Sequence, residues 1–303
     1  MFDIEYSILK FVIRFEKKCK IGKVKNSALR GVLGQSLIES SCIFELSKMS
    51  CDTCKYARSC ALSELFYSKL DSEFEGISNT TIPSYIIQCN EEKEYIDQGE
   101  TLSFNIIIFN RGIPYINLII ESLRKYGEIK GINGAKYNVI KVMNINGDNI
   151  FNDGKIQKDK IIIDTINSYI KNKTYKNNVS LEFITPFRHK KNKELTRILS
   201  LEDIIKSIYN RIIMLNALQG NKIDLNGYNL DRKEDEEIYY SKSTWIESKR
   251  FSNKQRNLLA MGGIVGKITI KNPSDKLMEI LVAGEVLQVG KNTSFGLGQY
   301  KLR

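Results

Sequence analysis

The feature of this sequence that most constrains its fold is one order of secondary structure that occurs twice. Apolar residues that alternate or recur at helical spacing predict a strand, a helix, two strands, a helix and a strand in each half. In the first half these elements are expected at residues 5–15, 26–39, 82–90, 101–110, 113–127 and 137–145. In the second half they are expected at residues 179–189, 200–218, 238–251, 262–272, 275–288 and 294–303. The repeated order predicts an α+β fold of two tandem ferredoxin-like (βαββαβ) domains.

The domain boundaries follow from this order. Residues 1–146 are predicted to form the N-terminal ferredoxin-like domain, with a cysteine-bearing insertion at about residues 42–60. Residues 147–178 are rich in Asn, Asp and Lys, which is typical of a junction between domains. Residues 179–303 are predicted to form the C-terminal domain, which carries a glycine-rich loop.

Local signals predict where the helices begin and end. Asn26 or Ser27 is the expected N-cap of the first helix, and Gly127 is the expected stop of the second. Ser200 and Asp203 form a capping pattern in front of the third helix.

The charge of the chain indicates the kind of partner. The sequence has 46 Lys and Arg residues against 35 Asp and Glu residues, a formal net charge of +11. This excess favours a polyanion, with nucleic acid ahead of an acidic membrane, because neutralised phosphates release counterions. General solubility is the alternative explanation. The stretch MFDIEYSILKFVIRF has a charged residue every few positions, unlike a signal peptide or membrane span, so a cytoplasmic protein is expected.

Four of the six cysteines form a pattern that is typical of metal sites. Their spacing is C-x8-C-x2-C-x5-C, and the residues are Cys42, Cys51, Cys54 and Cys60. Four thiolates are the number that a closed structural zinc site requires. An iron–sulfur cluster and four reduced, partly buried thiols are the alternatives. Cys19 and Cys89 lie in strand-like sequence and are expected to be small core residues.

The stretch GKNTSFGLGQY at residues 290–300 is predicted to form a loop that binds phosphate. Glycines allow the backbone to approach a ligand closely, so that successive N–H groups can converge on an anion. A tight connection between a helix and a strand, with glycines serving the turn, is the alternative. A Walker-type nucleotide loop fits worse, because the order of strand, G-x4-G-K-[ST] and helix is absent.

Six stretches together resemble a known family. They are GEVLQVGKNTSFGLGQYKL, GGIVGKITI, SKRFSNKQ, LRGVLGQSL, NRGIPYINLIIESLRKYG and TPFRHKKN. The set is similar to the CRISPR-associated endoribonucleases that cut repeat RNA, members of the repeat-associated mysterious protein (RAMP) superfamily. The resemblance implies tandem ferredoxin-like domains, binding of CRISPR precursor RNA and one cut in each repeat. It also implies cleavage without a metal, in which a ribose 2′-oxygen attacks its own phosphodiester and leaves a 2′,3′-cyclic phosphate.

Such a reaction calls for a base, an acid and cations around the phosphorus. The single histidine, His189, lies among basic neighbours that attract phosphate and favour the neutral imidazole. A surface histidine at a strand end that contacts RNA is the alternative. Many members of the family have a base histidine near the first helix, where this chain has none. Lys23, Lys25 and Arg30 are the cations available there, and Lys25 and Arg30 complete the predicted catalytic set.

Basic residues at element ends are predicted to bind RNA in a cleft between the two sheets. The predicted set is Arg111, Arg188, Lys190, Lys191, Arg250, Lys254 and Arg256, with Gly290, Lys291, Asn292, Thr293, Ser294, Gly296 and Gly298 of the loop. Aromatic residues interleave with these cations, and the exposed ones are expected to stack on unpaired bases. They are Phe109, Phe187, Tyr239, Tyr240, Trp245, Phe251 and Phe295.

Three other functions fit parts of the sequence. A catalytically inactive, guide-RNA-binding subunit of a CRISPR effector complex fits the missing first-helix histidine. A zinc- or cluster-dependent regulatory protein fits the cysteine pattern. A metal-dependent nuclease fits least, because the acidic run at residues 231–238 has no histidine cluster near it. Expected partners are the repeat RNA, effector-complex subunits and a second copy of the chain, with no membrane.

Overall fold

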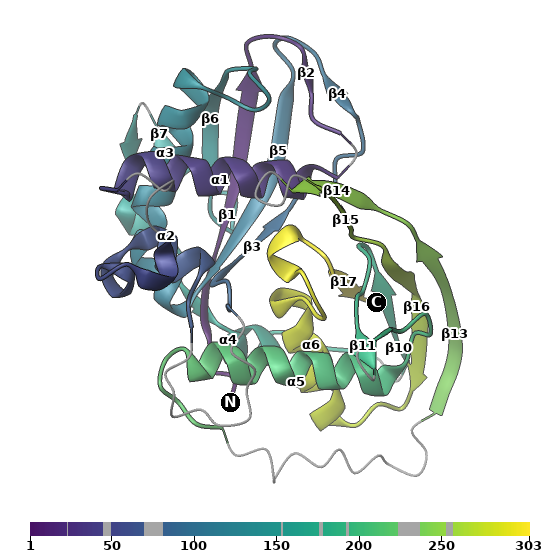
Figure 1. Cartoon of the computed structure of the whole chain (residues 1–303). Helices are drawn as coiled ribbons and strands as arrows, with labels where there is room; N and C mark the ends of the chain where they lie inside the picture. The colour runs from purple at the N-terminus through teal and green to yellow at the C-terminus, as the bar shows by residue number, and fades with distance from the viewer. Residues whose placement is uncertain are drawn as a thin grey trace. The chain divides into compact units, whose positions relative to one another are not determined.

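The computed structural model describes residues 1–22, 24–44, 50–69, 81–152, 154–175, 178–191, 194–223, 237–252 and 257–303. The chain folds into two compact units, shown in Figure 1. The N-terminal unit is Glu5–Asp164, and the C-terminal unit combines Met1–Ile4 with Thr165–Arg303. In the part of the chain that the structure describes, no helix has the length and apolar character needed to cross a membrane.

The N-terminal unit has an antiparallel sheet in the order β3-β5-β1-β6, with β9 paired to β1 outside this path. Helices α1 and α3 provide the crossovers and pack against each other. Alternating burial along β1 places Phe11 in the core, where its ring stacks on Phe104 at 5.2 Å. The elements are β1 (Glu5–Phe15), α1 (Lys25–Ser41), β3 (Tyr85–Gln88), β5 (Thr101–Phe109), α3 (Ile116–Ile129), β6 (Tyr137–Met143) and β9 (Asp164–Thr165).

The C-terminal unit repeats this topology, with an antiparallel sheet in the order β13-β16-β10-β17. Helices α5 and α6 pack against each other, and their apolar stripes are buried. The elements are β10 (Asn178–Phe183), α5 (Leu201–Ala217), β13 (Glu237–Ile246), β16 (Gly263–Lys271), α6 (Asp275–Leu287) and β17 (Tyr300–Leu302). The sequence-based prediction of two ferredoxin-like domains is confirmed, because each sheet has the strand order 2-3-1-4 of a βαββαβ unit.

Smaller elements decorate both units. In the N-terminal unit they are β2 (Cys19–Lys20), η1 (Cys51–Thr53), η2 (Ala57–Ser59), α2 (Ala61–Phe66), β4 (Tyr95–Ile96), η3 (Asn110–Tyr115), β7 (Phe151–Asn152), β8 (Lys155–Ile156) and η4 (Lys158–Lys160). In the C-terminal unit they are α4 (Ile166–Lys171), β11 (Lys190–Lys191), β12 (Glu194–Leu195), β14 (Lys249–Ser252), β15 (Asn257–Ala260) and η5 (Thr293–Phe295). The strand predicted at residues 238–251 is thus two strands, β13 and β14, of which β14 pairs with β15. The stretch predicted as a junction, residues 147–178, is divided between the units at Asp164.

Tertiary contacts overrule two of the predicted helix ends. Helix α1 begins at Lys25, and the Asn26 side chain accepts a hydrogen bond from Cys89 N at 2.7 Å instead of capping the helix. Gly127 lies inside α3, where an added Cβ would be 2.3 Å from the Tyr137 ring. This glycine therefore allows the helix to approach β6 closely rather than ending the helix. Ser200 precedes α5 as predicted, but its side chain makes no capping hydrogen bond within the described residues.

Candidate nucleic-acid interface

His189 lies in the C-terminal unit, beyond the end of β10, and both of its ring nitrogens face α5. Nδ1 is 3.1 Å from Ser207 Oγ, and Nε2 is 3.5 Å from Asp203 Oδ1. The imidazole stacks on the Phe187 ring with centroids 5.9 Å apart. Two backbone hydrogen bonds join Phe187 to Ile264 of β16. A strand end and a helix therefore hold the ring in place.

The hydrogen bonds of Ser207 assign the tautomer of this histidine. The Ser207 hydroxyl donates to the backbone oxygen of Asp203 at 2.7 Å. A hydroxyl has one proton, so Ser207 Oγ is left to accept a hydrogen bond from His189 Nδ1–H. In the neutral imidazole the lone pair is then on Nε2. The ring can accept a proton at Nε2, on the side that faces Asp203.

Burial and three lysine ammonium groups lower the pKa of this imidazole. Burial lowers the pKa of His189 below its ordinary value, and the Asp203 carboxylate opposes this shift. The ammonium groups of Lys206, Lys191 and Lys291 lower the pKa further. At neutral pH the imidazole is therefore uncharged. We call His189, Lys191, Lys206 and Lys291 the His189 cluster.

The three lysines come from separate elements and face solvent. Lys191 is exposed on β11, and Lys291 is exposed in the glycine loop. Lys206 extends from α5 and forms an ion pair with Glu202 one turn earlier. The backbone N–H of Lys291 donates to Arg188 O at 2.8 Å, which fixes the loop beside the chain that carries His189. Lys191 and Lys291 therefore offer positive charge to an anion such as a phosphate, whereas the charge of Lys206 is paired with Glu202.

The glycines of the loop serve its internal packing. Gly298 has a φ of +74°, and an added Cβ would be 1.7 Å from Val289 O. Gly290 has a φ of +85°, and its added Cβ would be 2.5 Å from Arg188 O. These positions favour glycine because of both the left-handed backbone and the close approach of another backbone. The loop therefore has the tight turn, with glycines serving its geometry, that the sequence analysis gave as the alternative to phosphate binding.

The predicted phosphate-binding residues of the loop divide into two groups. Lys291 and Asn292 are exposed, and Asn292 has the left-handed φ of 65°. Thr293 and Ser294 are buried, and Gly296, with a φ of +73°, follows them inside. The part of the loop that faces solvent is its first turn.

The other predicted RNA-binding residues differ in exposure. Lys190 is exposed on β11, and Arg111 is 40% exposed with its guanidinium 3.9 Å from Glu64. Arg188 is buried, donates to Gly262 O, and has a pKa lowered by burial, which Glu247 opposes. The Arg250 guanidinium lies over the Phe295 ring at 4.3 Å. Lys254 and Arg256, together with most of the acidic run at residues 231–238, lie outside the described residues.

The two predicted catalytic cations of α1 lie in the N-terminal unit and have internal partners. Lys25 is fully buried, and its Nζ donates to Glu91 O at 2.8 Å and to Gly22 O at 3.1 Å. Burial lowers the pKa of this ammonium group. The Arg30 guanidinium lies 4.9 Å from the centre of the Phe66 ring. Both side chains therefore contribute to the packing of α1.

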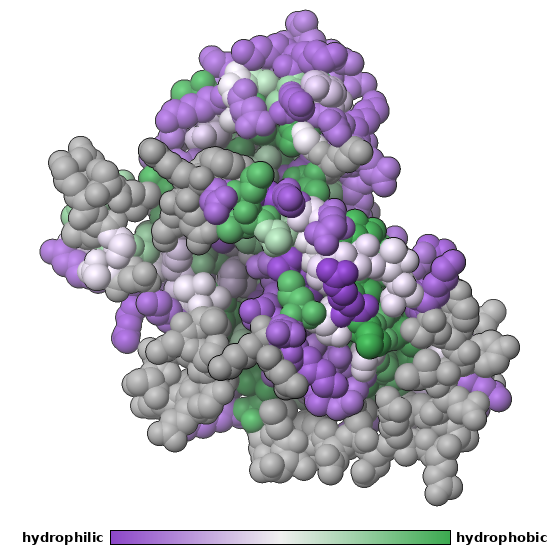
Figure 2. Space-filling model, turned by 45° about the vertical axis from the view of Figure 1, so that its right-hand side comes forward, coloured by the Kyte–Doolittle hydropathy of each residue, from purple (hydrophilic) through white to green (hydrophobic). Residues whose placement is uncertain are grey.

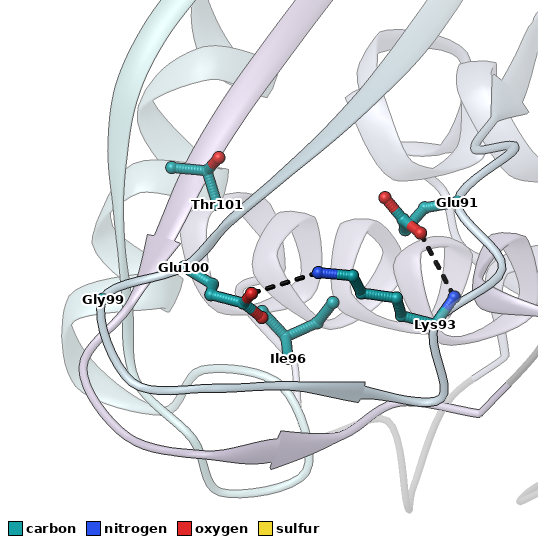
Figure 3. A pocket seen from close by; sticks show the side chains of 6 residues that line it. All are labelled: Glu91, Lys93, Ile96, Gly99, Glu100 and Thr101. Carbon is teal, nitrogen blue, oxygen red and sulfur yellow. Dashed lines mark hydrogen bonds and ion pairs between the residues drawn. The ribbon is translucent and has the colours of Figure 1, made fainter.

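A polar cavity of about 330 Å³ lies near Lys25 in the N-terminal unit (Figure 3). Its lining residues are Glu91, Lys93, Ile96, Gly99, Glu100 and Thr101. The Lys93 ammonium group turns toward Glu100 and lies 3.1 Å from that carboxylate. Two carboxylates face one ammonium group here, so the charge of the cavity disfavours a phosphate.

The four patterned cysteines also meet in the N-terminal unit. Cys42, Cys51, Cys54 and Cys60 line one cavity of about 30 Å³, together with Phe44, Ser50, Ala57, Leu62 and Ser63. Among the described residues, no three His, Cys, Asp or Glu side chains are arranged to hold a metal ion. The predictions of structural zinc or an iron–sulfur cluster therefore have no support. Cys19 and Cys89 are buried in the core, as predicted.

The sequence-based reasoning missed the α5 side of the site. Asp203 appeared only as a capping residue, and Ser207 and Lys206 were not singled out. Helical spacing was the available signal, because Asp203 and Ser207 are four residues apart and lie on one face. What the sequence lacked was the packing of His189 against that face.

The described residues on one face of the molecule are mixed in polarity. Figure 2 shows small hydrophobic patches set among hydrophilic residues, on the described part of the face that it presents.

Two ferredoxin-like units, with a glycine loop packed beside a histidine among lysines, give this chain a fold similar to that of solved Cas6 structures. Residues 4–164 match the family model AF_1859_N, described as an N-terminal domain. Residues 181–300 match the family model of the CRISPR-associated endoribonuclease Cas6. The first match covers more than half of the chain, which therefore belongs to the AF_1859_N family and carries a Cas6 match in its C-terminal region.

Similar proteins cover nearly the whole chain. An uncharacterized protein of Archaeoglobus fulgidus is 23% identical over 288 residues, which cover 90% of each chain. Cas6 of Thermus thermophilus has a TM-score of 0.54 at 11% identity, and a Cas6 substrate mimic complex has 0.53 at 13%; both matches cover 99% of each chain. A partial Cas6-RT-Cas1--Cas2 complex has a TM-score of 0.60 at 14% identity, with 99% of this chain and 46% of that chain covered. This chain thus spans less than half of that longer relative, and at these identities the likeness shows the fold.

Proposed function

We propose that this chain is an endoribonuclease that binds the repeat portion of CRISPR precursor RNA and cuts it to release guide RNAs. The observation that carries the proposal is the His189 cluster, in which three exposed ammonium groups act on an uncharged imidazole. The cations suit phosphate binding, and the imidazole suits proton transfer near neutral pH. The Cas6 match of residues 181–300 supports the substrate class.

The proposed reaction needs no metal. The ribose 2′-oxygen attacks the adjacent phosphorus, the bond to the 5′-oxygen breaks, and a 2′,3′-cyclic phosphate remains. His189 Nε2 takes the proton of the 2′-hydroxyl, and a neighbouring ammonium group supplies a proton to the leaving 5′-oxygen. Lys191 and Lys291 stabilise the charge that develops on the phosphorus oxygens.

Lys25 and Arg30 are the electrostatic part of the proposed catalytic set. Lys25 would reach a phosphate only after its hydrogen bonds to Glu91 O and Gly22 O break, because its side chain is fully buried. His189 is therefore the first catalytic candidate to test, and Lys25 is the second.

The test is cleavage of the repeat RNA encoded beside the gene, with saturating protein and EDTA present. We expect one cut per repeat and a cyclic phosphate product. His189→Ala should lower the single-turnover rate constant about 10²–10⁴-fold with RNA affinity retained. Tyr56→Ala, at an exposed aromatic residue of the N-terminal unit, is the control and should cut at the rate of the unmodified chain. RNA that stays intact while fully bound would remove the enzymatic claim.

A substrate with a 2′-deoxy sugar at the cut site checks the chemistry separately. It should bind as tightly as the unmodified RNA and resist cleavage, since the attacking oxygen is missing. Cleavage of this substrate would exclude attack by the 2′-oxygen.

An inactive guide-RNA-binding subunit of a CRISPR effector complex is the second candidate. It is favoured by the position of His189, whose two ring nitrogens both face α5. Tight RNA binding without any cleavage, and co-purification with effector subunits, would support it.

A second copy of the chain is another proposed partner. Size-exclusion chromatography with light scattering tests whether the chain forms a dimer.

A further inference from the structure

Trp245, the only tryptophan of the sequence, lies near the end of the edge strand β13 and is half-buried. The exposed Arg197 guanidinium lies over its ring, 5.1 Å from the ring centroid. The indole N–H donates to Glu247 Oε1 at 2.7 Å. The ring orientation is thus set by one contact on its face and one at its edge.

This pair lies close to the His189 cluster within the C-terminal unit. Thr196 N donates to His189 O at 3.0 Å, and Arg197 is the next residue in the chain. The hairpin of β11 and β12 therefore brings Arg197 back beside the strand end that carries His189.

The sheet places Trp245 near the same strand end. Ile264 of β16 pairs with Trp245 on one side and with Phe187 on the other. Adjacent strands are about 4.8 Å apart, so the backbones of Trp245 and Phe187 are separated by about 10 Å. His189 is two residues beyond Phe187. A polymer whose phosphate is at the His189 cluster can therefore extend over the indole.

The surroundings of the pair suit a flat apolar ligand with a charged backbone. Ile198, the residue after Arg197, is 74% exposed. Aromatic rings and guanidinium planes are the surfaces on which unpaired bases stack in RNA complexes. A buried structural pair would not expose its guanidinium and an apolar neighbour in this way.

We propose that Arg197 and Trp245 form a stacking subsite for one unpaired nucleobase of the RNA whose phosphate occupies the His189 cluster. The inference rests on the proposed function, because RNA is its ligand. It selects one aromatic residue from the seven that the sequence offered, and it assigns this residue to the single-stranded part of the substrate.

The single tryptophan allows a direct measurement. The unmodified chain is titrated with repeat RNA that has a 2′-deoxy sugar at the cut site, and tryptophan fluorescence is recorded together with RNA anisotropy. We expect quenching that follows the binding curve. A blunt RNA duplex without unpaired bases should bind with little quenching.

Variants measure the energetic contribution. Trp245→Ala should weaken binding of the single-stranded RNA about 5- to 150-fold, the loss expected for one stacked base. Trp245→Phe should retain most of the affinity, and Arg197→Ala should weaken binding by a smaller factor. Tyr56→Ala is the matched control, since Tyr56 is 46% exposed beneath the Lys55 ammonium group, 5.1 Å away, in the N-terminal unit. It should bind within twofold of the unmodified chain.

The outcomes separate this inference from the proposed function. Absence of RNA binding by the unmodified chain would overturn both. Saturable RNA binding without quenching, with full affinity in Trp245→Ala and Arg197→Ala, would overturn the stacking subsite and leave the proposed function standing. The titration of the unmodified chain decides the matter even where Trp245→Ala fails to fold.

Discussion

Replacing Gly298 with Ala tests whether the glycine loop is specified by its own packing. The substitution places an alanine at a φ of +74°, which costs about 1–2 kcal/mol. The new Cβ would lie 1.7 Å from Val289 O, so the two ends of the loop must separate. The hydrogen bond from Val289 N to Gly298 O, now 3.1 Å long, would then be lost at about 0.5–1.5 kcal/mol. We expect the free energy of unfolding to fall by about 1.5–3.5 kcal/mol.

A matched control separates the close contact from the backbone conformation. Gly220 has a φ of +82° in the same unit, and an added Cβ there would have nothing within 4 Å. Gly220→Ala should therefore lose only the conformational part, about 1–2 kcal/mol. Urea unfolding followed by the fluorescence of Trp245 reports on the C-terminal unit directly. Equal losses in the two variants would refute the reasoning, because the contact with Val289 O would then have no effect.

Three further predictions concern stability, each measured by urea unfolding. Glu285 accepts hydrogen bonds from Leu302 N at 2.7 Å and from two tyrosine hydroxyls. Glu285→Ala should therefore lower the free energy of unfolding by about 2–4 kcal/mol. Glu279→Ala, at an exposed position of the same helix, is the control and should change it very little. Because the pKa of His189 is lowered in the folded chain, the unfolded chain binds more protons below about pH 6.5. The contribution of His189 to the free energy of unfolding should therefore be complete above that pH and fall as the pH drops. This pH dependence should be absent in His189→Gln. An identical pH profile for that variant would contradict the assignment. Lys25→Ala should lower the free energy of unfolding of the N-terminal unit by about 1–3 kcal/mol, because two hydrogen bonds of the buried ammonium group are lost. An equal loss in Lys10→Ala, at an exposed lysine of the same unit, would show that the burial of Lys25 is unimportant.

Much of the fold was predictable because its signals are local. The alternation along residues 5–15 and the apolar stripe of residues 201–217 are periodic patterns that one segment carries by itself. The short hairpin of β11 and β12 was not predicted, because two-residue strands have no period to detect. The site was predictable in its residue types and less so in its geometry. His189 and Lys291 were singled out from charge and motif, whereas their neighbours on α5 were not.

The sequence by itself determined the order of elements in both units, the basic character of the chain and its resemblance to the CRISPR-associated endoribonucleases, since these depend on periodicity, composition and motif, respectively. Only the tertiary structure decided which of the basic residues face solvent. The sequence predicted Lys25 as a catalytic cation and Arg188 as an RNA-binding cation, yet packing buries both against backbone carbonyls. Lys191 and Lys291, in contrast, remain exposed beside His189. Exposure depends on contacts between residues far apart in the chain, and no local pattern encodes those contacts.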